Sequence, residues 1–334
     1  MIVAFRADAS PRIGGGHVAR CLALAEALKQ RGADVHFIVR GELDLARSGV
    51  TAHALAAQEP DDAGTRRILE GLPERPRWLV VDHYGLAAPW ESAVSDLVDR
   101  IFVLDDLADR PHDCDLLLDQ SALGTERYAA LVPERCQVLY GLEHALLRSE
   151  YAEARATLVE HPPGIRSILA SLGAADPDNV TRQVIEGYQR ISAAPPLVVV
   201  AGRQNPHIAI LEAVCAEDSR ISLRIGVERM WELLVECDLA IGALGVSTWE
   251  RCCLGVPSLL VGLTPAQDEI AADLARRGLV RYLGPSPALG PAAYERAITE
   301  ALADPSAVRA MAARGMATID GRGAERVVAI MLAS

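Results

Sequence analysis

The sequence lacks any uninterrupted apolar run that approaches the ~20 residues needed to cross a bilayer, although half of its residues are apolar. Its beginning is also unlike a signal peptide, because Arg6 and Asp8 stand where such a peptide needs its apolar stretch. We therefore expect a cytoplasmic protein without a membrane segment.

Cofactor and metal patterns are scarce as well. The seven cysteines are scattered without metal-ligand spacing and indicate reduced, mostly buried thiols. No strand is followed by G-x-G-x-x-G with an acid ~20 residues further on, and no G-x-x-x-x-G-K-[ST] loop occurs. The sequence therefore offers little support for a dinucleotide cofactor and argues against a P-loop NTPase.

An excess of positive charge is absent too, since 33 Lys and Arg residues stand against 45 Asp and Glu residues, a formal net charge of -12. Such a balance does not attract nucleic acid or an anionic membrane, so we expect neither as a partner. A small local basic pocket for a phosphate is compatible with it.

What the sequence does contain is a regular alternation of apolar strands and amphipathic helices. Repeated strand–helix units with right-handed crossovers give a parallel sheet covered by helices on both sides. The 334 residues exceed one ordinary core, and the breaker cluster at residues 161–164 separates two such series. We expect an α/β protein with two doubly wound Rossmann-like domains, residues 1–150 and 151–334, that face a central cleft.

The expected strands lie at residues 2–5, 34–39, 51–55, 78–81, 101–104, 116–118 and 137–140 of the first domain, and at residues 167–172, 197–202, 222–225, 238–241 and 257–261 of the second. Three helical stretches are expected after the last strand. Polar residues gather just after the strands, at the carboxyl edge where ligands of parallel sheets bind.

Residues 13–20 link the first strand to the first long helix. Gly14, Gly15 and Gly16 let the backbone turn sharply and approach a bound group, and the first amides of a helix attract anions. His17 adds a titratable ring at the same place. The loop therefore indicates both a cradle for a ligand and a site of chemistry.

Two interpretations of His17 are open at this point. The ring can simply hydrogen-bond a neighbour at the start of the helix. If it is functional, the positive helix end disfavours the imidazolium, so the neutral ring accepts a proton near neutral pH. An acidic partner such as Asp8 would offset that effect.

A second glycine-containing turn leads from the strand at 238–241 into another helix. The hydroxyls of Ser247 and Thr248, with the free amides of the helix, can cap the helix or hold a diphosphate. Glu250 lies in the first turn, where it suits the helix dipole and can accept hydrogen bonds from two ribose hydroxyls. An N-cap followed by a first-turn acid is the simpler interpretation of the same residues.

Acidic and aromatic residues also follow two strands of the first domain. Adjacent carboxylates such as Asp105 and Asp106 can hold a metal or a helix N-terminus, but no further ligands cluster with them. Asp82, His83 and Tyr84 end another strand, where packing at the rim is the alternative to catalysis.

Taken together, these motifs resemble one family, the nucleotide-sugar hydrolases of pseudaminic acid biosynthesis. The resemblance rests, in the family's order, on residues 6–10, 13–17, 20–25, 81–84, 105–106, 141–148 and 249–257. It implies the glycosyltransferase-B fold, similar to the bacterial transferase that adds N-acetylglucosamine to the peptidoglycan lipid precursor. It further implies hydrolysis of UDP-2,4-diacetamido-2,4,6-trideoxy-β-L-altropyranose to UDP and the free sugar, with no metal and no other cofactor.

The resemblance also implies roles for single residues. His17 and Tyr84 would be catalytic and would face the sugar and the attacking water. Ser247 and Thr248 would lie near the phosphates, and Glu250 would bind the ribose. The remaining substrate-binding positions are Asp8, Arg12, Gly14, Gly15, Gly16, Gly173, Met230, Gly245 and Gln267.

Of these, the backbone near Met230 would face the uracil and Gln267 would approach the sugar. Two positions depart from the family pattern: Ala266 stands where an Asn is expected, and Ala174 where a Gly is expected. The first change removes one amide contact to the sugar. Ala tolerates positive φ less well than Gly, so the second shifts the turn slightly.

The resemblance implies an in-line mechanism in which neutral His17 takes a proton from water while UDP leaves on the opposite side, which inverts the anomeric centre. The loop of Gly14, Gly15 and Gly16 then serves catalysis more than nucleotide binding. We expect a monomer whose partner is a UDP-linked diacetamido sugar. Three alternatives are a glycosyltransferase with a UDP-amino sugar donor, a hydrolysing 2-epimerase and a sugar-nucleotide binding protein without activity.

Overall fold

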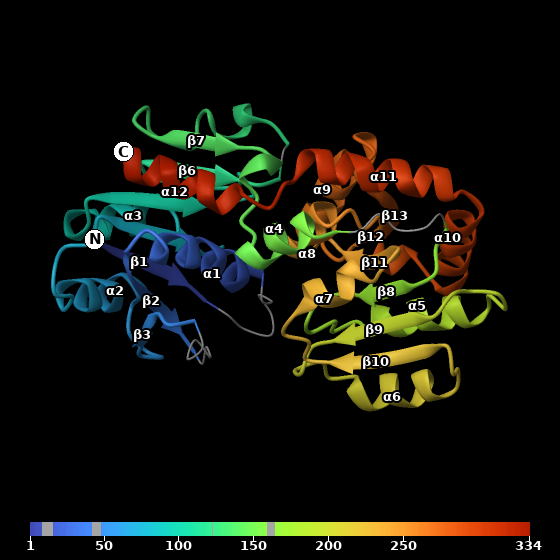
Figure 1. The fold of residues 1–334 in the computed structure, drawn as a ribbon. Helices are drawn as coiled ribbons and strands as arrows, with labels where there is room; N and C mark the ends of the chain where they lie inside the picture. Colours follow the sequence, from blue (N-terminus) through green and yellow to red (C-terminus); the bar gives the residue numbers. More distant parts are fainter. Residues whose placement is uncertain (9–15, 42–47, 122, 159–163) are drawn as a thin grey trace. The chain divides into compact units, whose positions relative to one another are not determined.

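The computed structural model describes residues 1–8, 16–41, 48–121, 123–158 and 164–334. Arg12, Gly14, Gly15 and most of the breaker cluster lie outside these ranges. The chain divides into two compact units (Figure 1). The N-terminal unit comprises Met1–Ser149 with Arg322–Ser334, and the C-terminal unit comprises Glu150–Gly321.

The described part of the N-terminal unit contains a parallel sheet of seven strands in the order β3-β2-β1-β4-β5-β6-β7. The strands are β1 Ile2–Ala7, β2 Asp34–Arg40, β3 Thr51–Leu55, β4 Trp78–Asp82, β5 Arg100–Leu104, β6 Leu116–Asp119 and β7 Gln137–Tyr140. Every residue of β1 is buried, because helices cover both faces of a parallel sheet.

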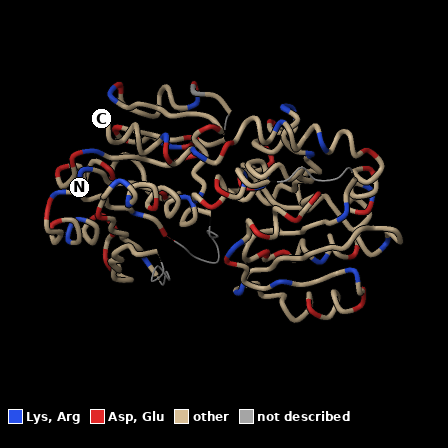
Figure 2. Tube along the Cα trace, viewed as in Figure 1, with Lys and Arg blue, Asp and Glu red and all other residues tan. Residues whose placement is uncertain are grey.

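One face of this sheet is covered by α1 (Gly16–Lys29) and α12 (Gly323–Ala333). The other is covered by α2 (Asp61–Glu70) and α3 (Ala88–Val94). Short 3-10 turns complete the unit at Ser95–Leu97, Thr125–Tyr128 and Leu142–His144. Acidic and basic residues are interspersed over both units (Figure 2).

The C-terminal unit repeats the design with a six-stranded parallel sheet, in the order β10-β9-β8-β11-β12-β13. Its strands are β8 Ile168–Ser171, β9 Leu197–Ala201, β10 Ile221–Ile225, β11 Leu239–Ala243, β12 Ser258–Gly262 and β13 Arg281–Pro285. Its helices are α4 Ser149–Ala156, α5 Val180–Gln189, α6 Ile208–Ala216, α7 Met230–Val235, α8 Val246–Cys253, α9 Pro265–Arg276, α10 Pro291–Ala303 and α11 Pro305–Thr318. Two doubly wound α/β units are therefore confirmed.

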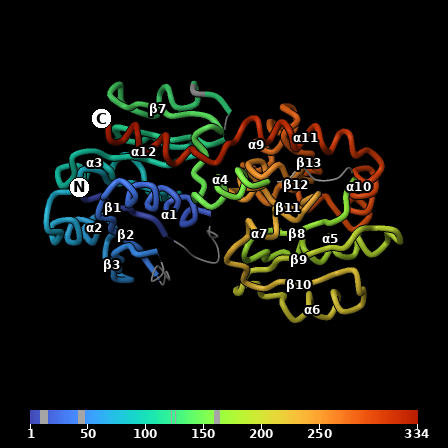
Figure 3. Tube along the Cα trace, viewed as in Figure 1, coloured from blue at the N-terminus to red at the C-terminus, as the bar shows by residue number. Residues whose placement is uncertain are grey.

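The C-terminal helix is the main correction to the expected organisation, which assigned residues 151–334 to one domain. Helix α12 belongs to the N-terminal unit and packs on α1, where the red end of the chain meets its blue beginning (Figure 3). Val327, Val328 and Met331 are buried there, and Trp78 Nε1 donates a hydrogen bond to the Met331 carbonyl at 3.1 Å. An apolar helix face packs wherever a complementary face is exposed, whatever its place in the sequence.

The end of the chain was also predicted with too few elements. Strand β13 was missed because Gly284 and Pro285 interrupt its pattern; it lies at the sheet edge and pairs with β12 through an irregular register. Four helices, α9 to α12, replace the three that were expected. Helices α4 and α6 were also missed. Within the described ranges, no helix is both long and apolar enough to span a membrane.

Candidate active site

His17 and Asp82 lie together at the carboxyl edge of the parallel sheet in the N-terminal unit. Their elements meet because Ala7 of β1 pairs with Asp82 of β4, at the point where the strand order reverses. His17 Nδ1 lies in hydrogen-bond contact with Asp82 Oδ1. Both side chains are buried, with exposed fractions of 6% and 1%. A histidine at the start of α1 and an acid at the end of β4 thus become one unit.

The Asp82 carboxylate is kept ionised by Arg20, one turn further along α1. Arg20 donates to Asp82 from Nε at 2.7 Å and from Nη2 at 2.8 Å. Burial alone would raise the pKa of the Asp82 carboxyl, but the charges of Arg20 and His17 and their hydrogen bonds hold that pKa well below its usual range. An ionised carboxylate only accepts hydrogen bonds, so Nδ1 of His17 donates. In the neutral ring, Nε2 then carries the lone pair.

Two further residues surround this pair. Arg20 Nη1 donates to Asp106 Oδ2 at 2.5 Å, which ties the residues after β5 to α1. The Tyr84 ring meets the His17 ring edge-on, with 4.4 Å between their centroids and an interplanar angle of 85°. Partial loss of hydration, together with the nearby acidic residues, raises the pKa of the Tyr84 hydroxyl, so this group keeps its proton and can donate a hydrogen bond.

Asp8 forms a separate cluster and is not the partner of His17, contrary to the possibility raised from the sequence. Its carboxylate accepts hydrogen bonds from Arg6 Nη2 at 2.9 Å and from the Arg40 amide at 2.8 Å, and it lies 3.3 Å from His83 Nε2. Burial opposes ionisation of Asp8, but the hydrogen bonds from His83 and Arg6 hold its pKa well below the usual range. Asp8 therefore organises the end of β1 rather than the His17 ring.

In the C-terminal unit, the turn from β11 into α8 brings several of the expected residues together. Gly245 is exposed and Ser247 is half-buried, whereas Thr248 is fully buried. The Thr248 hydroxyl lies 3.4 Å from the Ala243 carbonyl, to which it donates. Of the two hydroxyls proposed for the diphosphate, that of Ser247 is thus the more accessible.

Gln267 joins this turn to the next one. Its Nε2 donates to the Leu244 carbonyl at 3.1 Å, and its Oε1 accepts from the Leu263 amide at 2.9 Å. The side chain is therefore held across the carboxyl ends of β11 and β12. One Nε2 hydrogen remains to donate to a ligand.

The remaining expected residues lie at other strand and helix ends. Gly173 follows β8 with a φ of +93°, and a side chain there would meet open space. Met230 begins α7. Glu250 lies within α8 but beyond its first turn, which contains no acidic residue, so the expected first-turn position of this carboxylate was wrong: the helix begins at Val246, after Gly245. No group of three or more potential metal ligands occurs among the described residues.

Sequence reasoning missed the roles of Arg20 and of Asp82 as partner of His17. Arg20 follows His17 by three positions, which places the two side chains on the same face of a helix. That spacing could have indicated the role of Arg20 from the sequence. The pairing of His17 with Asp82 could not be predicted in this way, because it joins residues 65 positions apart in the chain.

Comparison with known proteins supports this architecture. No family model matches the sequence. The chain is 26% identical over 282 residues to the UDP-2,4-diacetamido-2,4,6-trideoxy-β-L-altropyranose hydrolase of Campylobacter jejuni, and the alignment covers 83% of this chain and 97% of that protein. The resemblance carried by the sequence motifs is thus confirmed as similarity over most of the chain.

Solved structures extend the comparison to the fold. MurG of Acinetobacter baumannii has a TM-score of 0.68 at 16% identity, covering 100% of this chain and 99% of that chain. Anabaena Alr3699/HepE, solved in complex with UDP, has a TM-score of 0.66 at 12% identity and full coverage of both chains. These likenesses and the two parallel sheets confirm the glycosyltransferase-B fold. The central cleft stays a prediction.

Proposed function

We propose that this protein is an enzyme acting on UDP-sugars, and that it hydrolyses UDP-2,4-diacetamido-2,4,6-trideoxy-β-L-altropyranose to UDP and the free sugar. The observation that carries the proposal is the contact of His17 Nδ1 with the buried Asp82 carboxylate. It leaves Nε2 as a proton acceptor at the start of α1. The similarity to the Campylobacter jejuni hydrolase, which spans 97% of that protein, supplies the substrate.

In this mechanism His17 acts as the general base. Nε2 takes a proton from a water molecule as the water oxygen bonds to the anomeric carbon. The bond from that carbon to the β-phosphate oxygen breaks, and its electron pair leaves with UDP. Asp82 holds the ring in the required tautomer and stabilises the imidazolium that forms. Attack opposite to the leaving group inverts the anomeric centre.

The other candidate residues have supporting parts in the proposal. Tyr84 packs edge-on against His17 and would direct its hydroxyl proton to the sugar. In the C-terminal unit, the amides at the start of α8 and the Ser247 hydroxyl would stabilise the departing diphosphate. Gln267 would offer its free Nε2 hydrogen to a sugar oxygen, and Glu250 would accept from the ribose. No metal takes part in these steps.

The test is an NMR time course with UDP-diacetamido sugars in water enriched in oxygen-18. The proposal expects UDP and free sugar from the altro compound, with the label in the sugar and none in UDP. The first product anomer should be inverted, and chelation of metals should leave the rate unchanged. Retention of the anomeric configuration, or label in UDP, would contradict the mechanism.

The variant His17→Gln should lose nearly all turnover while it still binds UDP. His53→Gln is the matched control, because His53 belongs to the same unit but contacts His36 on the neighbouring strand. Full turnover by His17→Gln would exclude His17 as the base. The same assay separates the alternatives: a changed C2 centre indicates an epimerase, sugar transfer to an added acceptor a glycosyltransferase, and UDP binding without any product a binding protein.

A further inference from the structure

The C-terminal unit buries a guanidinium that makes no ion-pair contact with a described carboxylate. Arg251 lies in α8 and is 1% exposed. Its nitrogens donate to Ser258 Oγ at 2.9 Å, Thr248 Oγ1 at 3.1 Å, the Ala243 carbonyl at 3.2 Å and Ser247 Oγ at 3.3 Å. All four acceptors are neutral. Among the described residues, no carboxylate lies within ion-pair distance of this group.

A buried cation without a counter-charge is unfavourable, because the side chain loses its hydration without the compensation of an ion pair. Burial accordingly lowers the pKa of Arg251, and the charge of Glu250 offsets this only in part, although an arginine keeps its proton in proteins. Arg220 of the same unit shows the usual arrangement, with Asp218 at 2.6 Å. The charge of Arg251 therefore requires an explanation beyond packing.

The fold makes room for this charge beneath the turn from β11 into α8. A Cβ atom at Gly242 would lie 2.6 Å from Arg251 Nη1, so the guanidinium occupies space that only a glycine leaves free. Three of its four acceptors, Ala243, Ser247 and Thr248, belong to the turn itself. The positive charge is thus directed at the turn and not at the opposite end of the helix.

The outer side of the same turn is open. A side chain at Gly245 would meet nothing within 4 Å. No described acceptor lies within hydrogen-bond reach of the Val246 and Ser247 amides, as is usual for the first turn of a helix. Because the Ser247 hydroxyl accepts from Arg251, its own proton is free to point outward. The two amides and the hydroxyl thus belong to one turn, and the buried charge bonds to that turn.

We propose that Arg251 is a positioning residue whose buried charge makes the turn at residues 243–248 selective for a diphosphate over an uncharged ligand. The ligand's negative charge offsets the buried positive charge without touching it, and the Ser247 hydroxyl, which accepts from Arg251, donates to the ligand. This inference rests on the proposed function, in which UDP is the leaving group. It adds a residue that touches no substrate but sets the affinity for its charged part.

The test compares UDP, UMP and uridine by calorimetry on Arg251→Gln and Arg251→Lys. Gln keeps an amide for the hydroxyl partners but removes the charge, whereas Lys keeps the charge. We expect Arg251→Gln to lower UDP affinity roughly tenfold or more, with uridine affinity changed less than about twofold. Arg251→Lys should stay within about threefold of the original UDP affinity. A purely structural residue would weaken all three ligands equally.

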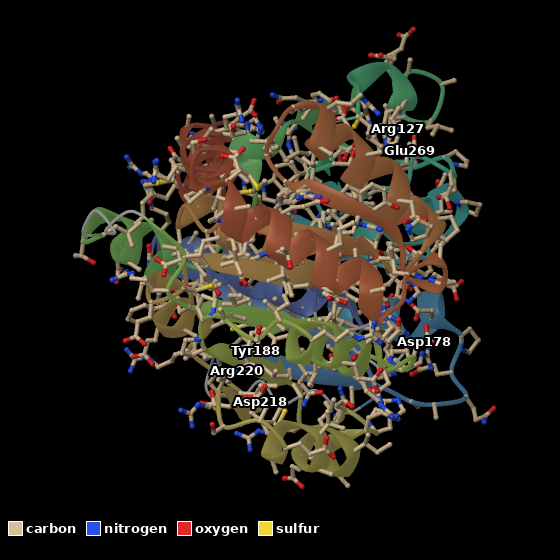
Figure 4. All side chains as sticks on the ribbon, turned by 90° about the vertical axis from the view of Figure 1, so that its right-hand side faces the viewer. Arg127, Asp178, Tyr188, Asp218, Arg220 and Glu269 are labelled. Atoms are coloured by element: carbon tan, nitrogen blue, oxygen red, sulfur yellow. The ribbon has the colours of Figure 1, made fainter. Side chains whose placement is uncertain are left out.

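Arg220→Gln is the matched control, since it removes one positive charge from the same unit at a distant place. Figure 4 shows Arg220 beside Tyr188 and Asp218, with its guanidinium 5.0 Å from the Tyr188 ring centroid. UDP affinity should be unchanged in this variant. A loss as large as in Arg251→Gln would overturn the inference, because overall charge would then explain both.

Equal losses of affinity for UDP and for uridine in a folded Arg251→Gln protein would also overturn the inference about Arg251. If that variant does not fold, Ser247→Ala replaces it, and an unchanged UDP affinity there overturns the inference. Different results would refute the proposed function and the role of Arg251. If the protein turns over the UDP-sugar but its UDP affinity does not depend on Arg251, only the role of Arg251 is refuted. If UDP binding depends on Arg251 but no hydrolysis occurs, only the proposed hydrolase activity is refuted.

Discussion

The Arg20 guanidinium donates two hydrogen bonds to the Asp82 carboxylate, from Nε at 2.7 Å and from Nη2 at 2.8 Å. The same carboxylate contacts His17 Nδ1. Arg20 and His17 share one face of α1, so a single helix presents both partners to the end of β4. The charge of Arg20 keeps Asp82 an acceptor, and an acceptor at Nδ1 is what leaves Nε2 of His17 free for chemistry.

Replacing Asp82 by Asn should abolish most turnover and leave substrate binding nearly unchanged. An amide can donate to Nδ1 and so favours the tautomer with its proton on Nε2, which cannot act as a base. We expect kcat to fall on the order of 10³-fold or more, with KM changed little. Steady-state assay of UDP release measures both values. Asp99→Asn, which disturbs only an exposed pair with Arg75, should have normal kcat; equal losses in both variants would contradict the role of Asp82.

Tyr84 should act through its ring as well as its hydroxyl. Tyr84→Phe keeps the edge contact with His17 and should lower kcat/KM by no more than about tenfold, the scale of one lost hydrogen bond. Tyr84→Ala removes the contact as well and should lower kcat/KM further. Tyr84 is 50% exposed, so both variants should fold. Identical losses in the two would show that the hydroxyl alone matters.

Asp119 should make the protein less stable as the pH rises. Burial, with the charge of Asp106, raises the pKa of Asp119 to about 6 despite hydrogen bonds from Ser121, against an ordinary value of about 3.9. The folded state therefore binds the proton more tightly than the unfolded state. Stability falls between about pH 4 and pH 6 and levels off above that range.

The variant Asp119→Asn has no such proton to lose. The difference in unfolding free energy between this variant and the original protein should shift in favour of the variant by up to about 2 kcal/mol as the pH rises from about 4.5 to 7. Urea denaturation at several pH values provides the comparison. A difference between the two proteins that does not vary with pH would show that Asp119 titrates normally in the folded state.

Helix α12 should contribute to the stability of the N-terminal unit. Met331 is fully buried whereas its neighbour Leu332 is 36% exposed. Met331→Ala should cost about 2 to 4 kcal/mol of unfolding free energy, and Leu332→Ala less than about 0.5 kcal/mol. Chemical denaturation measures both. Similar effects of the two substitutions would mean that α12 is not anchored through its buried face.

The sequence by itself determined most of the elements and the class of fold. The run at residues 2–5, buried within β1, is apolar because helices cover both sides of a parallel strand. Alternation of such runs with amphipathic stretches requires doubly wound units. The glycines before His17 and at Gly245 mark the turns at which the chain leaves a strand for a helix. These signals are local, so they can be recognised without the tertiary structure.

Only the tertiary structure decided which residues meet. His17 pairs with Asp82 at the end of β4, which lies beside β1 in the sheet, whereas Asp8, which is nearer in the sequence, is held by Arg6 and the Arg40 amide. Helix α12 returns to the N-terminal unit because its buried face fits α1. Only the surroundings of Arg251 showed that its buried charge is bonded to neutral acceptors and not to a described carboxylate. Hydrophobic periodicity specifies that a side chain is buried, but partners are set by strand order and packing between segments far apart in the chain.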